Sequence, residues 1–332
     1  MHDHRKFVFY MLALMLAVSA TGCSHAAAPT SASTKGGHDE APREAVVDSP
    51  KQLETATAYR AKLGEPRHGA VLYIPPWFTP RRGGYDLIFH FHGLSKLQEA
   101  NIERAQLNVA VVSVNLGAGT DPYSNAFQKP ESFERLLADT TAEIDKSGRA
   151  NGAKPRRIAF SAWSAGFVSI SAIMKEPEVA QRVDAILLAD GFFTNFTDPK
   201  KRIVNRESLE RFAKLVGAAQ KNEKLFAITH TAIPTGPWPS VQECLATLLD
   251  MTSIPKTPAR GTGPKPGMKE TYVVHQGSFH VTGYDGMAAG DHVNQIKAMG
   301  DTLYPYLKAR WDAQDAAEGK RPLDNGQPRA SP

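Results

Sequence analysis

The sequence predicts an α/β fold, in which a mainly parallel, twisted sheet is flanked by helices on both faces and forms a single domain. First, strand-like and helix-like segments alternate along the central part of the chain. Second, strand candidates such as residues 109–112 and 185–188 are continuous apolar runs, which is typical of strands that helices cover on both sides. Third, 332 residues with 42% hydrophobic and 22% charged residues suffice for one large domain.

Apolar periodicity predicts the individual elements. Strands are predicted at residues 69–75, 85–92, 109–115, 157–161, 184–190, 225–231 and 270–275. Helices are predicted where one stripe of residues is apolar, at residues 131–146, 167–175 and 291–310. Residues 192–217 could form a small lid, but no second domain and no internal repeat is evident.

The N-terminal segment is predicted to be an export signal. Arg5 and Lys6 precede an apolar run, residues 7–20, that is short for a membrane-spanning helix. Residues 20–23, Ala-Thr-Gly-Cys, resemble a bacterial lipobox, in which Cys23 is lipidated and becomes the mature N-terminus. We therefore expect an exported lipoprotein of the bacterial cell envelope, attached to the membrane only through Cys23. A plain cleaved signal peptide is the alternative.

Composition predicts the domain boundaries. Residues 1–22 form the signal peptide, and residues 23–50 form a flexible tether because they contain too few apolar groups to offset the entropy of ordering. The folded domain is expected at residues 51–312. Residues 313–332 are polar and rich in Pro and Gly, and are expected to be a disordered tail.

Charge and cysteine content exclude several functions. The net charge of +5 is modest and lacks a basic block, so nucleic-acid binding is not expected. No Cys/His spacing indicates a zinc site, and we expect no metal and no cofactor. Cys23 and Cys244 are the two cysteines, so no intrachain disulfide can form once Cys23 is lipidated. Cys244 lies in an apolar helical pattern and is expected to be buried.

A small-residue turn around Ser164 is the strongest candidate for chemistry. Residues 158–167 pass from an apolar strand through Ala162-Trp163-Ser164-Ala165-Gly166 directly into a helical pattern. This is the sequence form of a nucleophile elbow, in which a sharp strand-to-helix turn exposes a serine Oγ above the sheet. The usual first glycine is replaced by Ala162, and a plain small-residue turn is the alternative interpretation.

The partners of such a serine are expected at the carboxyl ends of other strands. Residues 87–92 end in His92-Gly93, and a His-Gly run after an early strand predicts an oxyanion hole formed by the backbone amides of Leu94 and Ala165. Asp190 closes an apolar strand, where a carboxylate costs desolvation unless it is paired, so it is the candidate acid. An Asx turn or a helix cap is the alternative role for Asp190.

Two histidines compete for the role of base. His292, at the start of the final predicted helix, is preferred because the helix would hold its imidazole firmly. His280, a few residues after the last predicted strand, is the alternative; His230 comes one strand too early for the order Ser, Asp, His. One objection to His292 is that a helix N-terminus disfavours a protonated imidazole.

The side chains of Trp163, His92 and Phe192 are expected to contact substrate, although core packing would also explain the aromatic residues. Taken together, His92-Gly93, the turn at Ser164, Asp190 and a late histidine resemble the α/β-hydrolase superfamily over residues 66–311. Residues 73–77 resemble a strand end of secreted esterases similar to feruloyl esterases and polyester depolymerases. The resemblance implies a serine hydrolase that cleaves small-molecule carboxylic esters. A peptidase or amidase with the same triad, or a non-catalytic binding lipoprotein, remains open.

Overall fold

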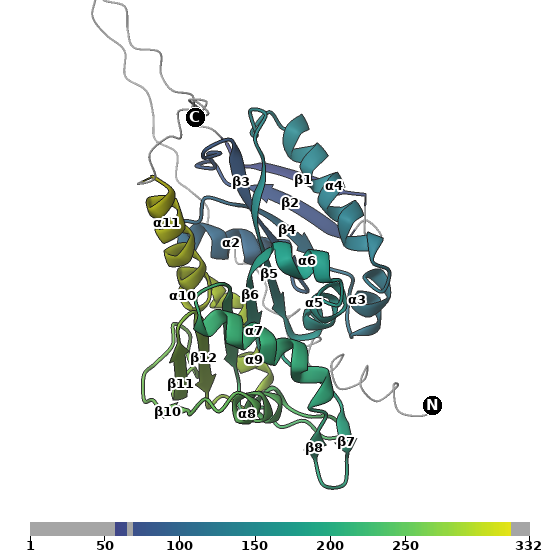
Figure 1. The fold of residues 1–332 in the computed structure, drawn as a ribbon, viewed down its shortest axis with the longest axis vertical. Coiled ribbons are helices and arrows are strands. Elements are labelled where there is room, and N and C mark those ends of the chain that lie inside the picture. The colour runs from purple at the N-terminus through teal and green to yellow at the C-terminus, as the bar shows by residue number, and fades with distance from the viewer. Residues whose placement is uncertain (1–56, 65–68, 320–332) are drawn as a thin grey trace, which may run out of the picture. The chain divides into compact units, whose positions relative to one another are not determined.

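A ten-stranded sheet organises the described part of the chain, residues 57–64 and 69–319 of a computed structural model (Figure 1). Across the sheet the strands are β1 (Tyr59–Leu63), β2 (Ala70–Ile74), β4 (Ala110–Val114), β3 (Gly84–Phe91), β5 (Lys154–Trp163), β6 (Val183–Ala189), β9 (Leu225–His230), β12 (Phe279–Tyr284), β11 (Glu270–Gln276) and β10 (Thr257–Pro258). The strands from β4 to β12 run parallel, and antiparallel strands lie at both edges. A separate antiparallel hairpin joins β7 (Phe196–Asp198) and β8 (Ile203–Val204).

Helices cover both faces of the sheet (Figure 1). One face carries α2 (Ser95–Ala105), α9 (Ala289–Lys297), α10 (Met299–Thr302) and α11 (Tyr304–Gly319). The other carries α3 (Asp121–Ala126), α4 (Glu131–Lys146), α5 (Phe167–Ile173), α6 (Pro177–Arg182), α7 (Glu210–Gln220) and α8 (Val241–Met251), with short 3-10 turns η1 (Ser164–Gly166) and η2 (Glu207–Leu209). The predicted fold class is therefore confirmed, and the described residues belong to one compact unit.

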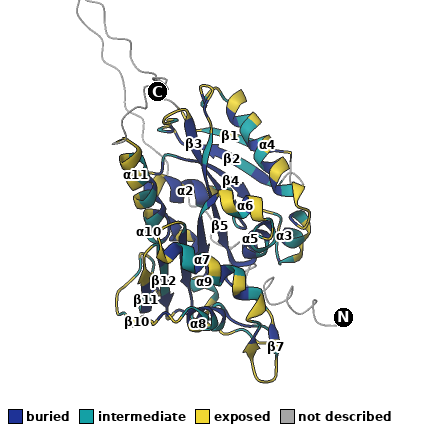
Figure 2. Ribbon diagram, in the orientation of Figure 1, coloured by how far each residue is buried: buried dark blue, intermediate teal, exposed yellow. Residues whose placement is uncertain are grey.

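Successive side chains of β5 point to opposite faces of the sheet and contact the helices on each face. Phe160 packs edge-on against Phe133 of α4, with ring centroids 5.0 Å apart. Its neighbour Ser161 points to the opposite face, where its hydroxyl lies 3.3 Å from that of Tyr304 in α11. Because successive residues of a strand face opposite sides, a run of buried residues requires cover on both sides. Figure 2 shows the central strands as the most deeply buried part of the fold.

Five of the described strands were not predicted from the sequence: β1, β7, β8, β10 and β12. β1 has the mixed pattern Tyr-Arg-Ala-Lys-Leu, because as an edge strand it is only half buried. β12 pairs with β11 through the two-residue turn Gly277-Ser278, and in the sheet it lies parallel to β9. A Gly-Ser pair between strand-like runs is a hairpin signal, so this strand was recognisable. Residues 192–217 contain the β7–β8 hairpin and the start of α7, which packs on β9.

The C-terminal region differs from its prediction in two ways. The single helix expected at residues 291–310 is three helices, α9 to α11. Pro305 cannot donate a backbone hydrogen bond to a preceding turn, which favours a break before it. The expected tail from residue 313 is also wrong in part, since α11 continues to Gly319. Asp315 explains this, because its carboxylate pairs with Arg81 at 2.9 Å and Arg156 at 2.9 Å.

The predicted signal peptide, the lipidation site Cys23 and the tether up to residue 50 lie outside the described residues, as do residues 320–332 of the expected tail. Within the described ranges, no helix has the length and apolar character required to cross a membrane.

Candidate active site

Three neighbouring parallel strands, β3, β5 and β6, are each followed directly by a residue in the left-handed backbone region. These residues are His92 (φ 73°), Ser164 (φ 51°) and Asp190 (φ 46°). A non-glycine residue in this conformation costs about 1–3 kcal/mol, and such strain gathers at functional sites. Because parallel strands end at the same edge, the three side chains belong to one edge of the sheet.

The turn at Ser164 is built by close backbone approaches. A Cβ on Gly166 would lie 2.0 Å from the carbonyl oxygen of Phe91, so the helix after the serine packs directly on the end of β3. A Cβ on Gly191 would lie 2.7 Å from the backbone nitrogen of Ser164 and 2.8 Å from its carbonyl oxygen. Glycine is therefore required at position 191 because the backbone of Ser164 lies too close for a side chain. The left-handed backbone conformation is adopted by Asp190 and not by Gly191. Ala162 is fully buried, and its methyl group is accommodated where the usual motif has glycine.

Asp190 and His292 form a buried hydrogen-bonded pair. His292 Nδ1 lies 2.7 Å from Asp190 Oδ2, with both side chains shielded from solvent. Thr231 supports the same carboxylate through its hydroxyl, 2.7 Å from Oδ2, and its backbone N–H, 3.0 Å from Oδ1. Burial acts to raise the pKa of Asp190, but the hydrogen bonds from His292 and Thr231 outweigh it and the pKa lies below its usual value. Asp190 is thus a fixed anion that orients the imidazole.

Thr231 was not predicted. It is the first residue after β9, so the same strand-end rule that selected Asp190 would have pointed to it. Its contribution depends on two strands being adjacent, which a local pattern does not reveal.

The other ring nitrogen of His292 is available. With Nδ1–H donating to a carboxylate, Nε2 carries a lone pair and acts as an acceptor. It is buried and has no hydrogen-bond partner among the described residues, so it makes no hydrogen bond to Ser164 in this structure. Hydrogen bonds of this kind are often long without substrate and tighten when substrate binds. Ser164 itself is 2% exposed.

His280 occupies a different position from the one predicted for it. It lies within β12 and not in the loop before the last helices. In the sheet, His280 pairs with Ala227 of β9, whereas the last residue of β9, His230, pairs with Gly283. His280 therefore lies three residues, or about 10 Å, from the carboxyl edge of the sheet. Its Nδ1 lies 3.0 Å from Nδ1 of His275, and its ring stacks on Tyr306. The structure therefore brings Asp190 together with His292 and not with His280.

The segment after β3 presents a backbone donor. Gly93 has φ 111°, and Leu94 precedes α2 with its side chain 61% exposed. None of the described residues accepts a hydrogen bond from the Leu94 N–H. Ala165 lies in the first turn after Ser164, where backbone N–H groups lack partners within the helix. Both expected oxyanion amides thus belong to turns at the same edge of the sheet.

The three expected substrate contacts have different surroundings. His92 Nδ1 lies 2.7 Å from the Tyr123 hydroxyl, while its Nε2 is buried without a partner among the described residues. Trp163 is 8% exposed and stacks on the His92 ring. Phe192 is fully buried, with its ring centroid 5.3 Å from those of Phe167 and Phe212. Phe192 is thus held in an aromatic cluster, where burial gains more free energy than exposure at the turn, and its contact with substrate stays a prediction.

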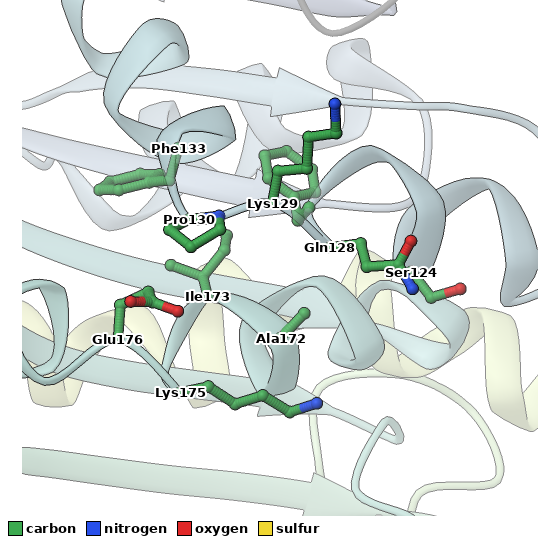
Figure 3. Close-up of a pocket in the computed structure, with 10 residues that line it drawn as sticks. Ser124, Gln128, Lys129, Pro130, Phe133, Ala172, Ile173, Lys175 and Glu176 are labelled. Atoms are coloured by element: carbon green, nitrogen blue, oxygen red, sulfur yellow. The ribbon is translucent and has the colours of Figure 1, made fainter.

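A cavity of about 150 Å³ lies elsewhere, between the α3–α4 connection and the end of α5 (Figure 3). Its lining includes Ser124, Lys129 and Lys175. Because Lys175 follows the last turn of α5 while Ser164 precedes its first turn, the cavity is separated from the site by the length of that helix. The described residues contain no group of three or more His, Cys, Asp or Glu side chains placed to hold a metal ion.

Three features together define the fold. They are a mainly parallel sheet with helices on both faces, a strand–turn–helix elbow after β5, and Ser164, Asp190 and His292 in that chain order. The fold is an α/β-hydrolase fold.

The chain is similar to known proteins in its fold, at low sequence identity. No family model matches the chain, and no curated protein matches its sequence. It is similar to the enterobactin esterase from Shigella flexneri, with 13% identity, a TM-score of 0.45, and coverage of 78% of this chain and 60% of that one. It is similar to a feruloyl esterase module from Clostridium thermocellum, with 15% identity, a TM-score of 0.40 and coverage of 71% and 82%. A thermophilic esterase from Thermogutta terrifontis gives 14% identity, a TM-score of 0.39 and coverage of 82% and 96%.

Proposed function

We propose that the protein is a serine hydrolase that cleaves small-molecule carboxylic esters, with Ser164 as nucleophile, His292 as base and Asp190 as the orienting acid. The observation that carries the proposal is the buried hydrogen bond from His292 to Asp190, at the strand edge where Ser164 adopts its left-handed turn. Acyl transfer requires a carboxylate, an imidazole with an available Nε2 and a hydroxyl, and all three groups lie at this edge of the sheet.

The reaction proceeds in two steps. Ser164 Oγ attacks the ester carbonyl carbon while its proton passes to His292 Nε2, and the new imidazolium is balanced by Asp190. The tetrahedral species collapses, and the departing alkoxide takes the proton from His292, which leaves an acyl group on Ser164. A water molecule then repeats the attack with His292 again as base, and the acid and free Ser164 are released.

Backbone amides stabilise the negative charge that develops on the substrate oxygen. Leu94 and Ala165 supply the N–H groups, and one such donor is worth about 2.7–4 kcal/mol in the transition state. His92 completes the substrate contacts, because its buried Nε2 has no partner among the described residues and gains one when substrate enters.

The test is Ser164→Ala measured with p-nitrophenyl acetate and short-chain esters. Loss of turnover with an unchanged melting temperature is expected, since the side chain is small and its role is chemical. Ser171→Ala, the same change within α5, is the matched control and should retain wild-type turnover. Unchanged turnover in pure Ser164→Ala protein would overturn the proposal.

Two further measurements separate the other functions. A fluorophosphonate probe labels an activated serine, so absent labelling together with ligand binding would indicate a non-catalytic binding protein. A matched panel of esters and amides distinguishes an esterase from a peptidase or amidase, because the same triad serves both reactions.

We also propose that the enzyme is an exported lipoprotein held at the cell envelope through Cys23. The support is the basic and apolar N-terminal sequence followed by Ala-Thr-Gly-Cys. Metabolic labelling with an alkyne fatty acid should mark the wild-type protein and not Cys23→Ser. A simple cleaved signal peptide would leave both proteins unlabelled.

A further inference from the structure

The indole of Trp163 connects the segments that carry the proposed nucleophile and base. Trp163 is the last residue of β5 and immediately precedes Ser164. Its Nε1–H donates a hydrogen bond of 3.0 Å to the backbone carbonyl oxygen of His292, which is 129 residues away in the sequence. This bond ties the end of the nucleophile strand to the main chain of α9 at the residue that bears the imidazole.

The ring of Trp163 also contacts both imidazoles at this edge. The His92 ring stacks on it at 4.9 Å with an interplanar angle of 7°, and the His292 ring lies at 4.7 Å with an angle of 33°. A Cβ on Gly93 would lie 3.7 Å from Trp163 Cε3, so the indole also abuts the turn that presents the Leu94 amide. With 8% of its surface exposed, Trp163 is in contact almost entirely with protein.

The electrostatic surroundings of His292 determine how easily its imidazole becomes protonated. His292 is the fourth residue of α9, and the positive end of a helix dipole disfavours the imidazolium that forms during acyl transfer. Asp190 opposes this effect through Nδ1. An aromatic face next to the ring also attracts a cation, and indole does so more strongly than the other aromatic side chains.

We propose that Trp163 is a positioning residue for the proposed base: its Nε1–H fixes the main chain of His292, and its ring supports the imidazolium. The inference rests on the proposed function, since it concerns the same triad. It assigns Trp163 a role through His292 in place of the substrate contact expected from its position beside Ser164.

Few titratable groups face His292, which makes its protonation measurable. In the described residues these are Asp190, which holds Nδ1, and His92, whose pKa is lowered to about 3 by burial and by the nearby His292. His92 is therefore neutral over the working pH range. Asp291 is adjacent on α9 but accepts the backbone N–H of Ala288. The acidic limb of a pH–rate profile should thus report His292.

Two substitutions separate the two contributions. Trp163→Phe retains an aromatic face and removes the Nε1 donor, whereas Trp163→Leu removes both. We expect kcat to fall with KM nearly unchanged, by roughly 2- to 30-fold for each lost contribution. In Trp163→Leu the apparent pKa of the acidic limb of kcat/KM should also move down, because the imidazolium has lost its aromatic neighbour.

Trp311→Phe is the matched control. Trp311, in α11, donates a hydrogen bond of 2.8 Å from Nε1 to Asp184 near the start of β6, whereas Asp190 follows the end of that strand. This variant therefore also loses an indole hydrogen bond, but away from the site. It should lower stability without moving the acidic limb. An NMR titration of the His292 ring, without substrate, gives the same pKa independently of turnover.

The outcomes are distinguishable. If the substitutions change KM alone, Trp163 contacts the substrate and the inference is overturned. An unmoved His292 pKa in Trp163→Leu would overturn it as well. If Trp163→Leu does not fold, unchanged kcat in Trp163→Phe would overturn the role of the Nε1–H. Retained turnover in Ser164→Ala would instead overturn the proposed function itself.

Discussion

His292 Nδ1 lies 2.7 Å from Asp190 Oδ2, although 102 residues separate the two in the chain. The contact exists because β6 ends at Ala189, while α9 begins shortly after β12, two strands further along the sheet. The contact pairs Asp190 with His292, the histidine that the sequence already favours as base, and not with His280, which is twelve residues away.

The first prediction compares His292→Ala with His280→Ala. In the proposed mechanism, removal of His292 leaves Ser164 without a base, and loss of a triad member lowers kcat by about 10³- to 10⁶-fold. His280 contacts His275 and Tyr306 within the sheet, so His280→Ala should retain near wild-type ester turnover. Steady-state kinetics on both purified variants provide the measurement. Inactivation by His280→Ala with activity retained in His292→Ala would reverse the assignment.

The second prediction concerns Asp190→Asn. The amide can donate to Nδ1, which places the proton of His292 on Nε2. In the proposed mechanism this removes the acceptor for the Ser164 proton. A loss of about 10⁴-fold in kcat is expected from the wrong tautomer. Asp291→Asn is the matched control, because its carboxylate accepts the N–H of Ala288 and an amide oxygen can do the same. Equal kinetics for these two variants would contradict the role of Asp190.

The third prediction tests the close approach at Gly191. A methyl group there would lie 2.7 Å from the Ser164 nitrogen, so Gly191→Ala should displace the turn and lower both stability and turnover. Gly217 in α7 has open space around its Cα, and Gly217→Ala should be neutral or stabilise the protein by up to about 1 kcal/mol. Urea unfolding and ester kinetics measure both effects. Wild-type stability and turnover in Gly191→Ala would show that the turn relaxes freely.

The fourth prediction is a pH dependence of stability caused by His90. This buried residue is held by Ser161 Oγ at 2.9 Å and the His92 carbonyl at 2.8 Å, and burial lowers its pKa to about 3. Between its unfolded pKa of about 6.5 and pH 3, only the unfolded state binds the proton, so stability falls as the pH falls. The expected slope is about 1.4 kcal/mol per pH unit.

Urea unfolding between pH 4.5 and 7.5 measures this slope. His90→Gln removes the titrating group, so its stability should fall less steeply with decreasing pH than that of the wild type. His92 has a similarly lowered pKa and keeps its own contribution in both proteins. Identical slopes would show that His90 is not buried in its neutral form.

Local patterns determined much of the fold. Continuous apolar runs predicted the central strands, and small residues beside Ser164 predicted a strand-to-helix turn, because both signals arise within a few residues. The hairpin turn Gly277-Ser278 was a local signal of the same kind, and recognising it would have placed His280 inside β12. The break before Pro305 was also visible in the sequence.

By itself, the sequence determined which residues end the strands, since apolar runs and the turns after them are properties of consecutive residues. Only the tertiary structure decided which ends are neighbours: Asp190 with Thr231 and His292, Gly191 with Ser164, and Trp163 with the main chain of His292. It also placed Phe192 in the core and continued α11 to Gly319. These relationships depend on strand order and on packing between distant segments, and the same local pattern is compatible with several such arrangements.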